Sequence, residues 1–476
     1  MRLAQRTFTN SDQQRFASAS GDRNPMHLDE LMARRTQAGF PVVHGVHLLL
    51  WALDALGETQ PDLPPLRKLR ARFNKFVYLN EDAEVELTQQ NQTSARISVS
   101  VDGIARSKYT LEFGDEVGNV PDWFGSSLQE IAFSREPLNV KFEEIPGRSG
   151  RVAFQLTSTD AAAMFPAATR WLGTRRIASL AASTHLVGML FPGLHSIYNE
   201  LAVTSCQDCA VEEFLGFRVV DADTRVRTVD HEIAGGGWTG IVHSIARKPP
   251  VLQRTMDSLT GVVGAEEFSG AVALIIGGSR GLGELTAKLI ATGGGRPIIT
   301  WQRGKADAER VADEIRATGG VCDTLHYDAQ KPVVEQLAQL SEIPTHGYYF
   351  ATPLIFRPQS NIFVAERFQE FLAVYVNGFW ELAQALRTRR PQISLYYPSS
   401  VFVDERPNGM TEYTMAKVAG EVLCADMNAS LAPMHVTQSR LPRMQTDQTA
   451  SITDIETSDA VENLLPIIRE VQSWPR

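Results

Sequence analysis

Cysteine is scarce in this sequence, with four residues in a chain of 476. So few thiols in a chain of this length exclude the disulfide framework of a small secreted domain. Cys206 and Cys209 form a CxxC pair inside the strand-like run "VTSCQDCAVEEF". A structural zinc site would need two more ligands at matching spacing, and the sequence has no second CxxC. We therefore interpret the pair as two partly buried thiols and predict no metal site.

Long apolar runs and an excess of positive charge are also missing. The longest apolar runs, such as "GVHLLLWALDAL", are too short to span a bilayer, and "MRLAQRTFTNSDQQRF" lacks the apolar stretch of a secretory leader. A net charge of −9 disfavours a nucleic-acid partner. Hydrophobic residues, at 43%, are sufficient for several cores. We expect a globular cytoplasmic protein with no membrane partner.

The pattern of predicted strands and helices changes along the chain. From about residue 265, strand-like and helix-like segments alternate, which is typical of a doubly wound α/β domain with a parallel sheet. Before that point, one apolar helix followed by alternating strands occurs twice, with a seam near residue 130. We therefore predict three domains at residues 1–130, 131–255 and 265–476, the first two being related α+β units in which an antiparallel sheet wraps one helix.

The third domain opens with "GGSRGLG", which follows a predicted strand and begins a predicted helix. Gly277 permits a tight turn, while Gly281 and Gly283 allow a pyrophosphate to approach the free N–H groups of the helix N-terminus. The sequence thus predicts a dinucleotide site. The loop residues expected to contact the cofactor are Gly277, Ser279, Arg280, Gly281, Leu282 and Gly283.

A second chemical motif lies in "EYTMAK", where Tyr413 and Lys417 share one face of a helix. A lysine cation close to a phenol favours the phenolate, so Tyr413 could exchange a proton near neutral pH. The GxxxGxG spacing and this YxxxK pair resemble the short-chain dehydrogenase/reductase family over residues 268–450. The resemblance implies that Ser400 orients the substrate carbonyl, that Asn377 holds a proton-relay water and that Asp328 contacts the adenine.

Charge at the end of the second predicted strand bears on the choice of cofactor. NAD-binding folds usually place an acid there for the ribose hydroxyl, whereas "IITWQRGK" contains none. Arg280 in the glycine loop and Arg303 after the strand suit a 2′-phosphate, which favours NADPH. The sequence departs from the family at Ile276, where the family has Thr, and at Phe350–Pro353, where it has Asn-Asn-Ala-Gly.

The N-terminal stretch "SGDRNPMHLD" is dense in polar residues and is followed by "VVHG" at the start of the apolar helix. Together they resemble the MaoC-like, (R)-specific enoyl-thioester hydratases, which have a hot-dog fold. The resemblance implies that Asp22 and His27 flank one water and act as base and acid, while Asn24 and Pro25 shape the turn. A backbone N–H beside Gly45 could meet the thioester oxygen, because Gly45 has no side chain to obstruct it. His44 is interpreted as a structural neighbour.

The second predicted unit lacks this motif, so we interpret it as a degenerate half of a double hot dog with one active site. The fold predicted for the whole chain is an α+β double hot dog followed by a Rossmann-type α/β domain. The leading hypothesis is a bifunctional enzyme that reduces a 3-oxoacyl thioester with NADPH and interconverts 3-hydroxyacyl and trans-2-enoyl thioesters. Coenzyme A and an acyl carrier protein both fit as carriers, and a homo-oligomer is expected by analogy. Two alternatives remain open: that only one half is catalytic, or that the reductase acts on a nucleotide-linked sugar.

Overall fold

The computed structural model describes residues 1–115, 118–125, 127–356, 362–449 and 456–474. The chain divides into two compact units, with the main division between Pro249 and Pro250. Among the described residues, no helix has the length and apolar character needed to cross a membrane.

The N-terminal unit is built on one ten-stranded sheet in the order β1-β3-β4-β5-β2-β7-β10-β9-β8-β6. Neighbouring strands are antiparallel throughout, and β2 pairs with β7 at the centre, where Arg70 lies opposite Ala202. The strands are β1 Arg2–Thr7, β2 Leu66–Phe73, β3 Asp82–Gln90, β4 Ser94–Val101, β5 Ile104–Phe113, β6 Ser149–Ala153, β7 Ser196–Ser205, β8 Phe214–Asp223, β9 Thr228–Gly235 and β10 Trp238–Ala246. The first two predicted domains therefore share one sheet.

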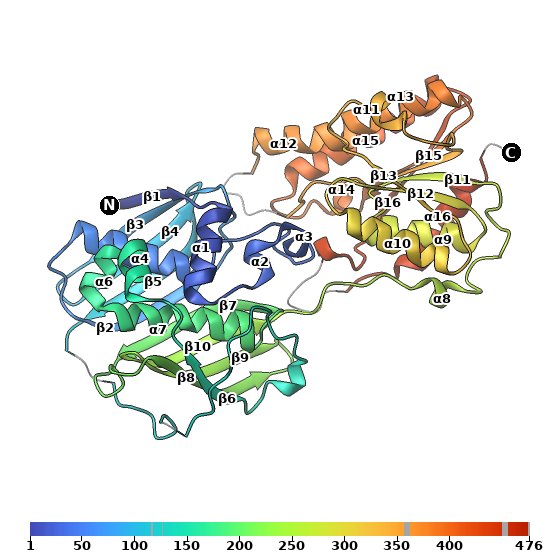
Figure 1. Ribbon diagram of the computed structural model, residues 1–476. Coiled ribbons are helices and arrows are strands. Elements are labelled where there is room, and N and C mark those ends of the chain that lie inside the picture. Colours follow the sequence, from blue (N-terminus) through green and yellow to red (C-terminus); the bar gives the residue numbers. More distant parts are fainter. Residues whose placement is uncertain (116–117, 126, 357–361, 450–455, 475–476) are drawn as a thin grey trace. The chain divides into compact units, whose positions relative to one another are not determined.

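Helices pack against one face of this sheet (Figure 1). They are α1 Asn10–Ser20, α2 Pro25–Leu28, α3 Glu30–Ala33, α4 Gly45–Thr59, η1 Phe142–Glu144, α5 Ser158–Met164, α6 Pro166–Leu172 and α7 Thr174–His185, which continues as a π-helical turn, η2 Leu186–Leu190. The central helices α4 and α7 are buried along most of their length; α4 is apolar on most sides, whereas α7 also buries small polar residues, among them Ser179, Ser183 and Thr184. Side chains on alternate strand positions meet them in one continuous core, which confirms the hot-dog-like antiparallel prediction.

The C-terminal unit contains a six-stranded parallel sheet in the order β13-β12-β11-β14-β15-β16. Its strands are β11 Val272–Ile276, β12 Arg296–Trp301, β13 Asp323–His326, β14 His346–Tyr349, β15 Ser394–Ser400 and β16 His435–Leu441. Its helices are α8 Met256–Leu259, α9 Gly281–Thr292, α10 Lys305–Ala317, α11 Val333–Leu337, α12 Ala365–Leu372, η3 Ala373–Gly378, α13 Phe379–Arg389, α14 Phe402–Glu405, α15 Thr411–Ser430, η4 Asp447–Thr449 and α16 Ala460–Gln472.

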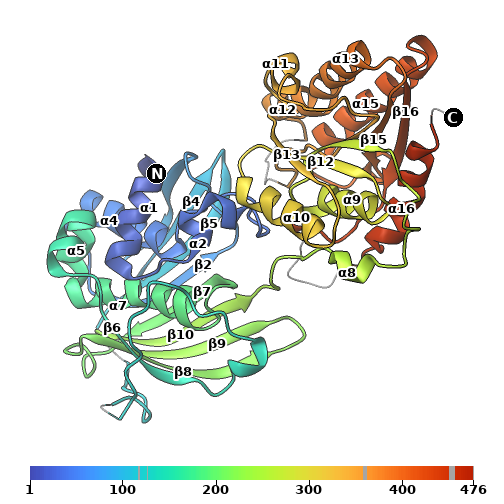
Figure 2. The ribbon, with the colours of Figure 1, turned by 45° about the vertical axis from the view of Figure 1, so that its right-hand side comes forward.

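Helices cover both faces of this parallel sheet (Figure 2). Successive residues of β11 enter two different cores, with Ala273 and Ile275 in one and Leu274 and Ile276 in the other. A strand buried on both faces needs the continuous apolar run "VALII", which the sequence supplies. Strand order reverses between β11 and β14, where α/β sheets bind ligands beyond the strand ends, and the doubly wound prediction is confirmed.

Candidate active sites

The "SGDRNPMHLD" stretch forms a bend between α1 and α2. Gly21 ends α1 in the left-handed region, with a φ of 81°, which favours glycine. Asn24 caps α2 by accepting a hydrogen bond from the N–H of Met26, and Pro25 is the first helical residue. Asp22 and His27 are thereby brought from the two sides of one short turn into the same buried space, as the sequence predicts.

The carboxylate of Asp22 is held by donors from two distant parts of the chain. Its side chain is buried, and Oδ1 accepts a hydrogen bond from the N–H of Asn24 at 3.1 Å. Oδ2 accepts a hydrogen bond from the hydroxyl of Thr184 at 2.6 Å. These two bonds compensate the carboxylate for part of the water it loses on burial.

The imidazole of His27 is oriented by one backbone carbonyl. Its Nδ1 lies 2.8 Å from the oxygen of Val42. Because a carbonyl can only accept, the ring proton is assigned to Nδ1, which leaves Nε2 with its lone pair. Burial lowers the pKa of His27 more than the nearby Asp22 raises it, so the neutral ring is favoured. The site therefore pairs a carboxylate with a neutral imidazole.

His44 lies against both members of this pair. Its ring stacks on that of His27 with centroids 3.7 Å apart. Its Nδ1 is 2.8 Å from Oε1 of Gln13, and its Nε2 is 3.1 Å from the carbonyl oxygen of Asp22. Two acceptors would suit a doubly protonated ring, but burial and the neighbouring histidines hold the pKa of His44 well below its usual range. We favour the neutral form because a second proton in this buried position lacks water to solvate it, so one of the two contacts carries no proton.

Asp22, His27 and His44 offer ligand atoms that lie within 4.8 Å of one another. Metal binding through both histidines requires an ion that lies in the planes of both rings. The rings are stacked with an angle of 22° between their planes and centroids 3.7 Å apart, so a nearby ion cannot lie in both ring planes. This geometry fits proton transfer better than metal coordination.

Gly45 begins α4, and its place at the helix start agrees with the sequence prediction. His44 is the N-cap and forms no side-chain capping bond among the described residues, so the first N–H groups of α4 have no side-chain cap. The prediction of free space beside Gly45 is wrong in one respect. A Cβ at Gly45 would lie 2.9 Å from the ring of Phe73, so an aromatic ring fills that space. Phe73 also packs edge-on against Tyr198.

The second half of the N-terminal unit contributes residues that sequence reasoning missed. Besides Thr184, the Nδ1 of His185 lies 2.9 Å from the oxygen of Gly21. Asn24 donates from Nδ2 to the oxygens of Gly188 and Gly193 at 2.9 and 3.1 Å. No local motif marks these residues, although the run "STHLVGML" contains three of them, Thr184, His185 and Gly188.

The glycine loop of the C-terminal unit connects β11 to α9. Gly277 and Gly281 have φ values of 77° and 60°, which only glycine adopts readily. A Cβ at Gly283 would lie 2.3 Å from the oxygen of Gly277, so α9 packs directly on the loop. Ser279 is buried, and Leu282 packs against the adjoining core. The strand–loop–helix arrangement fits a pyrophosphate at the α9 N-terminus.

The other predicted cofactor contacts surround this loop. Nη1 of Arg280 forms an ion pair with Asp447 at 3.1 Å. Arg303 is exposed just beyond β12, where the 2′-phosphate is expected. Asp328 is half-buried after β13, and its Oδ1 accepts a hydrogen bond from the N–H of Gln330 at 3.0 Å.

Tyr413, Ser400 and Lys417 come together in a buried cluster between β15 and α15. A side-chain hydrogen bond links Tyr413 to Ser400, and Nζ of Lys417 donates to the oxygen of Pro398 at 2.7 Å. The prediction that Lys417 favours the phenolate form of Tyr413 is wrong in this structure. Burial lowers the pKa of Lys417 to about 7 and raises that of Tyr413, so the cluster favours a neutral phenol.

Asn377 is not brought into this cluster. It lies in η3 with its side chain exposed, while Tyr375, two residues earlier, is buried. Nζ of Lys417 is 3.9 Å from the centre of the Tyr375 ring, and the Tyr375 hydroxyl lies 2.5 Å from Oγ1 of Thr352. Thr352 belongs to the segment Phe350–Pro353, which departs from the family pattern. The surroundings of Lys417 therefore include a contact between Tyr375 and Thr352 that the family pattern does not predict.

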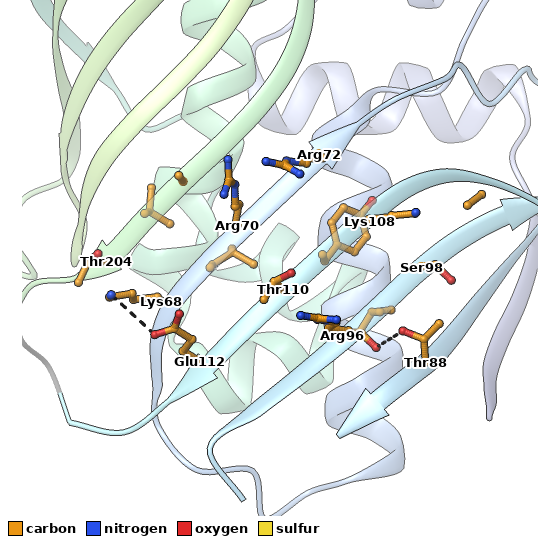
Figure 3. A pocket seen from close by; sticks show the side chains of 16 residues that line it. Lys68, Arg70, Arg72, Thr88, Arg96, Ser98, Lys108, Thr110, Glu112 and Thr204 are labelled. Carbon is orange, nitrogen blue, oxygen red and sulfur yellow. Dashed lines mark hydrogen bonds and ion pairs between the residues drawn. The ribbon is translucent and has the colours of Figure 1, made fainter. Parts of the chain in front are cut away.

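A groove of about 870 Å³ lies on the sheet face of the N-terminal unit that bears the outward side chains of β2, β4 and β5 (Figure 3). Its cations are Lys68, Arg70, Arg72, Arg96 and Lys108. Glu200 pairs with two of them, Arg70 at 2.5 Å and Arg72 at 2.7 Å. None of the residues predicted to be catalytic lines this groove.

Comparison with known proteins identifies both parts. Residues 2–108 match the family model described as MaoC like domain, and residues 271–457 match the model described as short chain dehydrogenase. The chain joins a MaoC-like domain to a short-chain dehydrogenase domain. Both family resemblances found in the sequence are thereby confirmed.

Individual relatives match smaller parts of the chain. The peroxisomal hydratase-dehydrogenase-epimerase of Saccharomyces cerevisiae is 32% identical over 82 residues, which are 17% of this chain and 9% of that protein. The 3-oxoacyl (acyl-carrier-protein) reductase of Agrobacterium tumefaciens, solved with NADP bound, is 18% identical with a TM-score of 0.36, covering 39% of this chain and 74% of that chain. A dehydrogenase/reductase from Sinorhizobium meliloti is 18% identical with a TM-score of 0.38, covering 44% and 90%.

Proposed function

We propose that this protein is a bifunctional acyl-thioester enzyme. Its N-terminal unit interconverts (R)-3-hydroxyacyl and trans-2-enoyl thioesters, and its C-terminal unit reduces 3-oxoacyl thioesters with NADPH. The single observation that carries the proposal is the buried Asp22–His27 pair beside the start of α4, on the same chain as the Ser400–Tyr413–Lys417 cluster. The product of the reduction is the substrate of the dehydration, and fusion raises its local concentration. The thioester carrier is coenzyme A or an acyl carrier protein, and the cytoplasm and a homo-oligomer are part of the same proposal.

Hydration requires removal of a proton from water and protonation of the substrate Cα. Nε2 of His27 and the carboxylate of Asp22 can hold the water between them, and His27 takes its proton as oxygen attacks Cβ. The proton then passes to Cα. Negative charge that develops on the thioester oxygen would be stabilised by the dipole and by the first N–H groups of α4, which have no side-chain cap among the described residues. Dehydration is the same path in reverse.

Reduction requires a bound dinucleotide, and the glycine loop fits one. Gly277 and Gly281 adopt the positive φ values of the tight turn, and Gly283 lets α9 pack directly on the loop. NADPH supplies the hydride when bound. Ser400 would orient the 3-oxo group, and the neutral phenol of Tyr413 would donate its proton to the carbonyl oxygen. With the dinucleotide bound, Lys417 would contact hydroxyl groups of the cofactor ribose in place of the Tyr375 ring. Arg280 and Arg303 would contact the 2′-phosphate.

Two assays on single-residue variants test the proposal. Hydration of crotonyl-CoA, followed at the enoyl chromophore, should be lost in Asp22→Asn and His27→Ala. NADPH oxidation with acetoacetyl-CoA should be retained by both variants. If the wild type catalyses neither reaction with CoA or carrier-protein thioesters, the assignment to acyl-thioester chemistry is wrong.

A second candidate function keeps the hydratase and makes the C-terminal unit a binding module. The exposed side chain of Asn377 and the contact of Lys417 with the Tyr375 ring favour it. Under this alternative, NADPH would bind with a measurable affinity by fluorescence, but no 3-oxoacyl thioester would be reduced.

A further inference from the structure

The catalytic carboxylate proposed above belongs to the first half of the double hot dog, but its side chain is held by the second half. Asp22 and Thr184 are separated by 162 positions in sequence, and their side chains meet at 2.6 Å. Thr184 lies near the end of α7 and is 4% exposed. Because an ionised carboxylate can only accept, the hydroxyl of Thr184 donates this hydrogen bond.

A second residue of this helical segment, Gly188, leaves room for the carboxylate of Asp22. Gly188 follows Thr184 by four positions, so the two lie on the same side of the helix where α7 continues as the π-helical turn η2. A Cβ at Gly188 would lie 2.3 Å from Oδ1 of Asp22. The end of this helix therefore supplies a hydrogen-bond donor, the Thr184 hydroxyl, and a space at Gly188, where there is no side chain. The carboxylate of Asp22 accepts the hydrogen bond and lies in that space.

The bond to Thr184 determines the orientation of the carboxylate. With Thr184 on Oδ2 and the N–H of Asn24 on Oδ1, rotation of the carboxylate would break a buried hydrogen bond. A buried bond to a charged group contributes about 1.5–3 kcal/mol. The remaining acceptor capacity of the two oxygens is then available to a water shared with His27.

We propose that Thr184 is a positioning residue of the hydration site, acting through Asp22, so that the motif-free half of the double hot dog completes the active site. This inference rests on the proposed function of Asp22. It gives the second half a role beyond filling the sheet, which is to fix the direction of the carboxylate.

The decisive variant is Thr184→Val, which keeps the shape of the side chain and removes the donor. We expect kcat for crotonyl-CoA hydration to fall roughly ten- to hundredfold, the factor that corresponds to one hydrogen bond to a charged group, with little change in KM. Thr184→Ser, which restores the hydroxyl, should recover most of the rate.

A matched control is Ser179→Ala, which removes another buried hydroxyl of α7. Ser179 donates to the oxygen of Gly235 at 2.8 Å and does not contact Asp22. It should leave kcat and KM close to wild type. If Thr184→Val and Ser179→Ala behave alike, or if Thr184→Val keeps the wild-type rate, the proposal is overturned.

A measurement without turnover separates this inference from the proposed function. The ¹³C chemical shift of the Asp22 carboxyl carbon, measured by NMR in the full chain, should change in Thr184→Val and return to the wild-type value in Thr184→Ser, because the shift depends on the hydrogen bond to Oδ2. Such a change in a protein that hydrates no enoyl thioester would support the contact and reject the proposed function. Identical chemical shifts in all three proteins would reject the contact, whatever the activity.

Discussion

The two proposed active sites hold their buried charged groups in opposite ways. The carboxylate of Asp22 has a hydroxyl and an N–H as donors, supplied by two distant segments. Lys417 donates to one carbonyl and otherwise lies against aromatic rings, and burial lowers its pKa to about 7. The hydration site is therefore organised before substrate binds, whereas the reduction site contains a cation that a cofactor hydroxyl would stabilise.

The largest expected effect tests whether the two sites are chemically independent. Tyr413→Phe removes the proposed proton donor, and NADPH oxidation with acetoacetyl-CoA should fall by about 10³-fold, within the range of general acid catalysis. Crotonyl-CoA hydration should stay within twofold of wild type, since Tyr413 belongs to the other compact unit. A parallel fall in both activities would show that the comparison between separate sites is wrong.

Gly188→Ala addresses the preorganised side of the comparison. The added methyl group would overlap the carboxylate of Asp22, because the new Cβ would lie 2.3 Å from Oδ1. We expect hydration to fall about a hundredfold and the N-terminal unit to lose about 1–3 kcal/mol from overpacking. Calorimetry and both activity assays measure this. NADPH oxidation at wild-type rate serves as the internal control, and full hydration activity would mean that Asp22 is free to move.

What the sequence predicted at each site depended on how local the residues are. Asp22 and His27 lie on one turn, and Tyr413 and Lys417 on one helix, so their spacing nearly fixes their geometry. The glycine loop is equally local. The fold class of each unit was also predictable from local patterns. Alternating apolar residues indicate strands buried on one face, as in the N-terminal unit, and continuous apolar runs indicate strands buried on both faces, as in the C-terminal unit.

The residues that sequence reasoning missed are joined by packing between distant segments. Thr184 reaches Asp22 only because β2 and β7 unite the two halves in one sheet. Phe73 fills the space beside Gly45 from the end of β2, and Tyr375 reaches Lys417 from η3. Asn377 matches a family position, but the backbone there is a π-helical turn, whose register a pattern of residue types does not specify.

The pH dependence of stability tests the cation of the reduction site. The pKa of Lys417 is about 7 in the folded protein and near 10.4 when unfolded, so the unfolded chain binds more protons between these values. Lys417 therefore destabilises the apo C-terminal unit by a few kcal/mol at pH 7, and this penalty fades as the pH rises toward 10. Lys417→Met should raise the unfolding midpoint at pH 7 and lose most of that advantage by pH 10.

Thermal unfolding of the full chain can assign this effect, because bound NADPH raises the midpoint of the unit that binds it. The cofactor should raise the wild-type midpoint more than that of Lys417→Met, since only wild type gains a partner for its amine. Equal midpoints for both apo proteins from pH 7 to 10 would mean that Lys417 is adequately solvated in the folded state.

The smallest expected effect concerns selectivity between cofactors at the same site. Arg303 is exposed beyond β12, whereas the side chain of Arg280 is only 25% exposed, so Arg303 is the more accessible cation for a 2′-phosphate. Because an exposed ion pair is screened by water, Arg303→Ala should raise KM for NADPH only about three- to tenfold and leave KM for NADH unchanged. The NADPH effect should shrink as salt is added, since screening weakens exposed charge pairs. An equal rise in KM for both cofactors would instead place Arg303 against the shared part of the dinucleotide, so that the preference would depend on Arg280 and its release from Asp447.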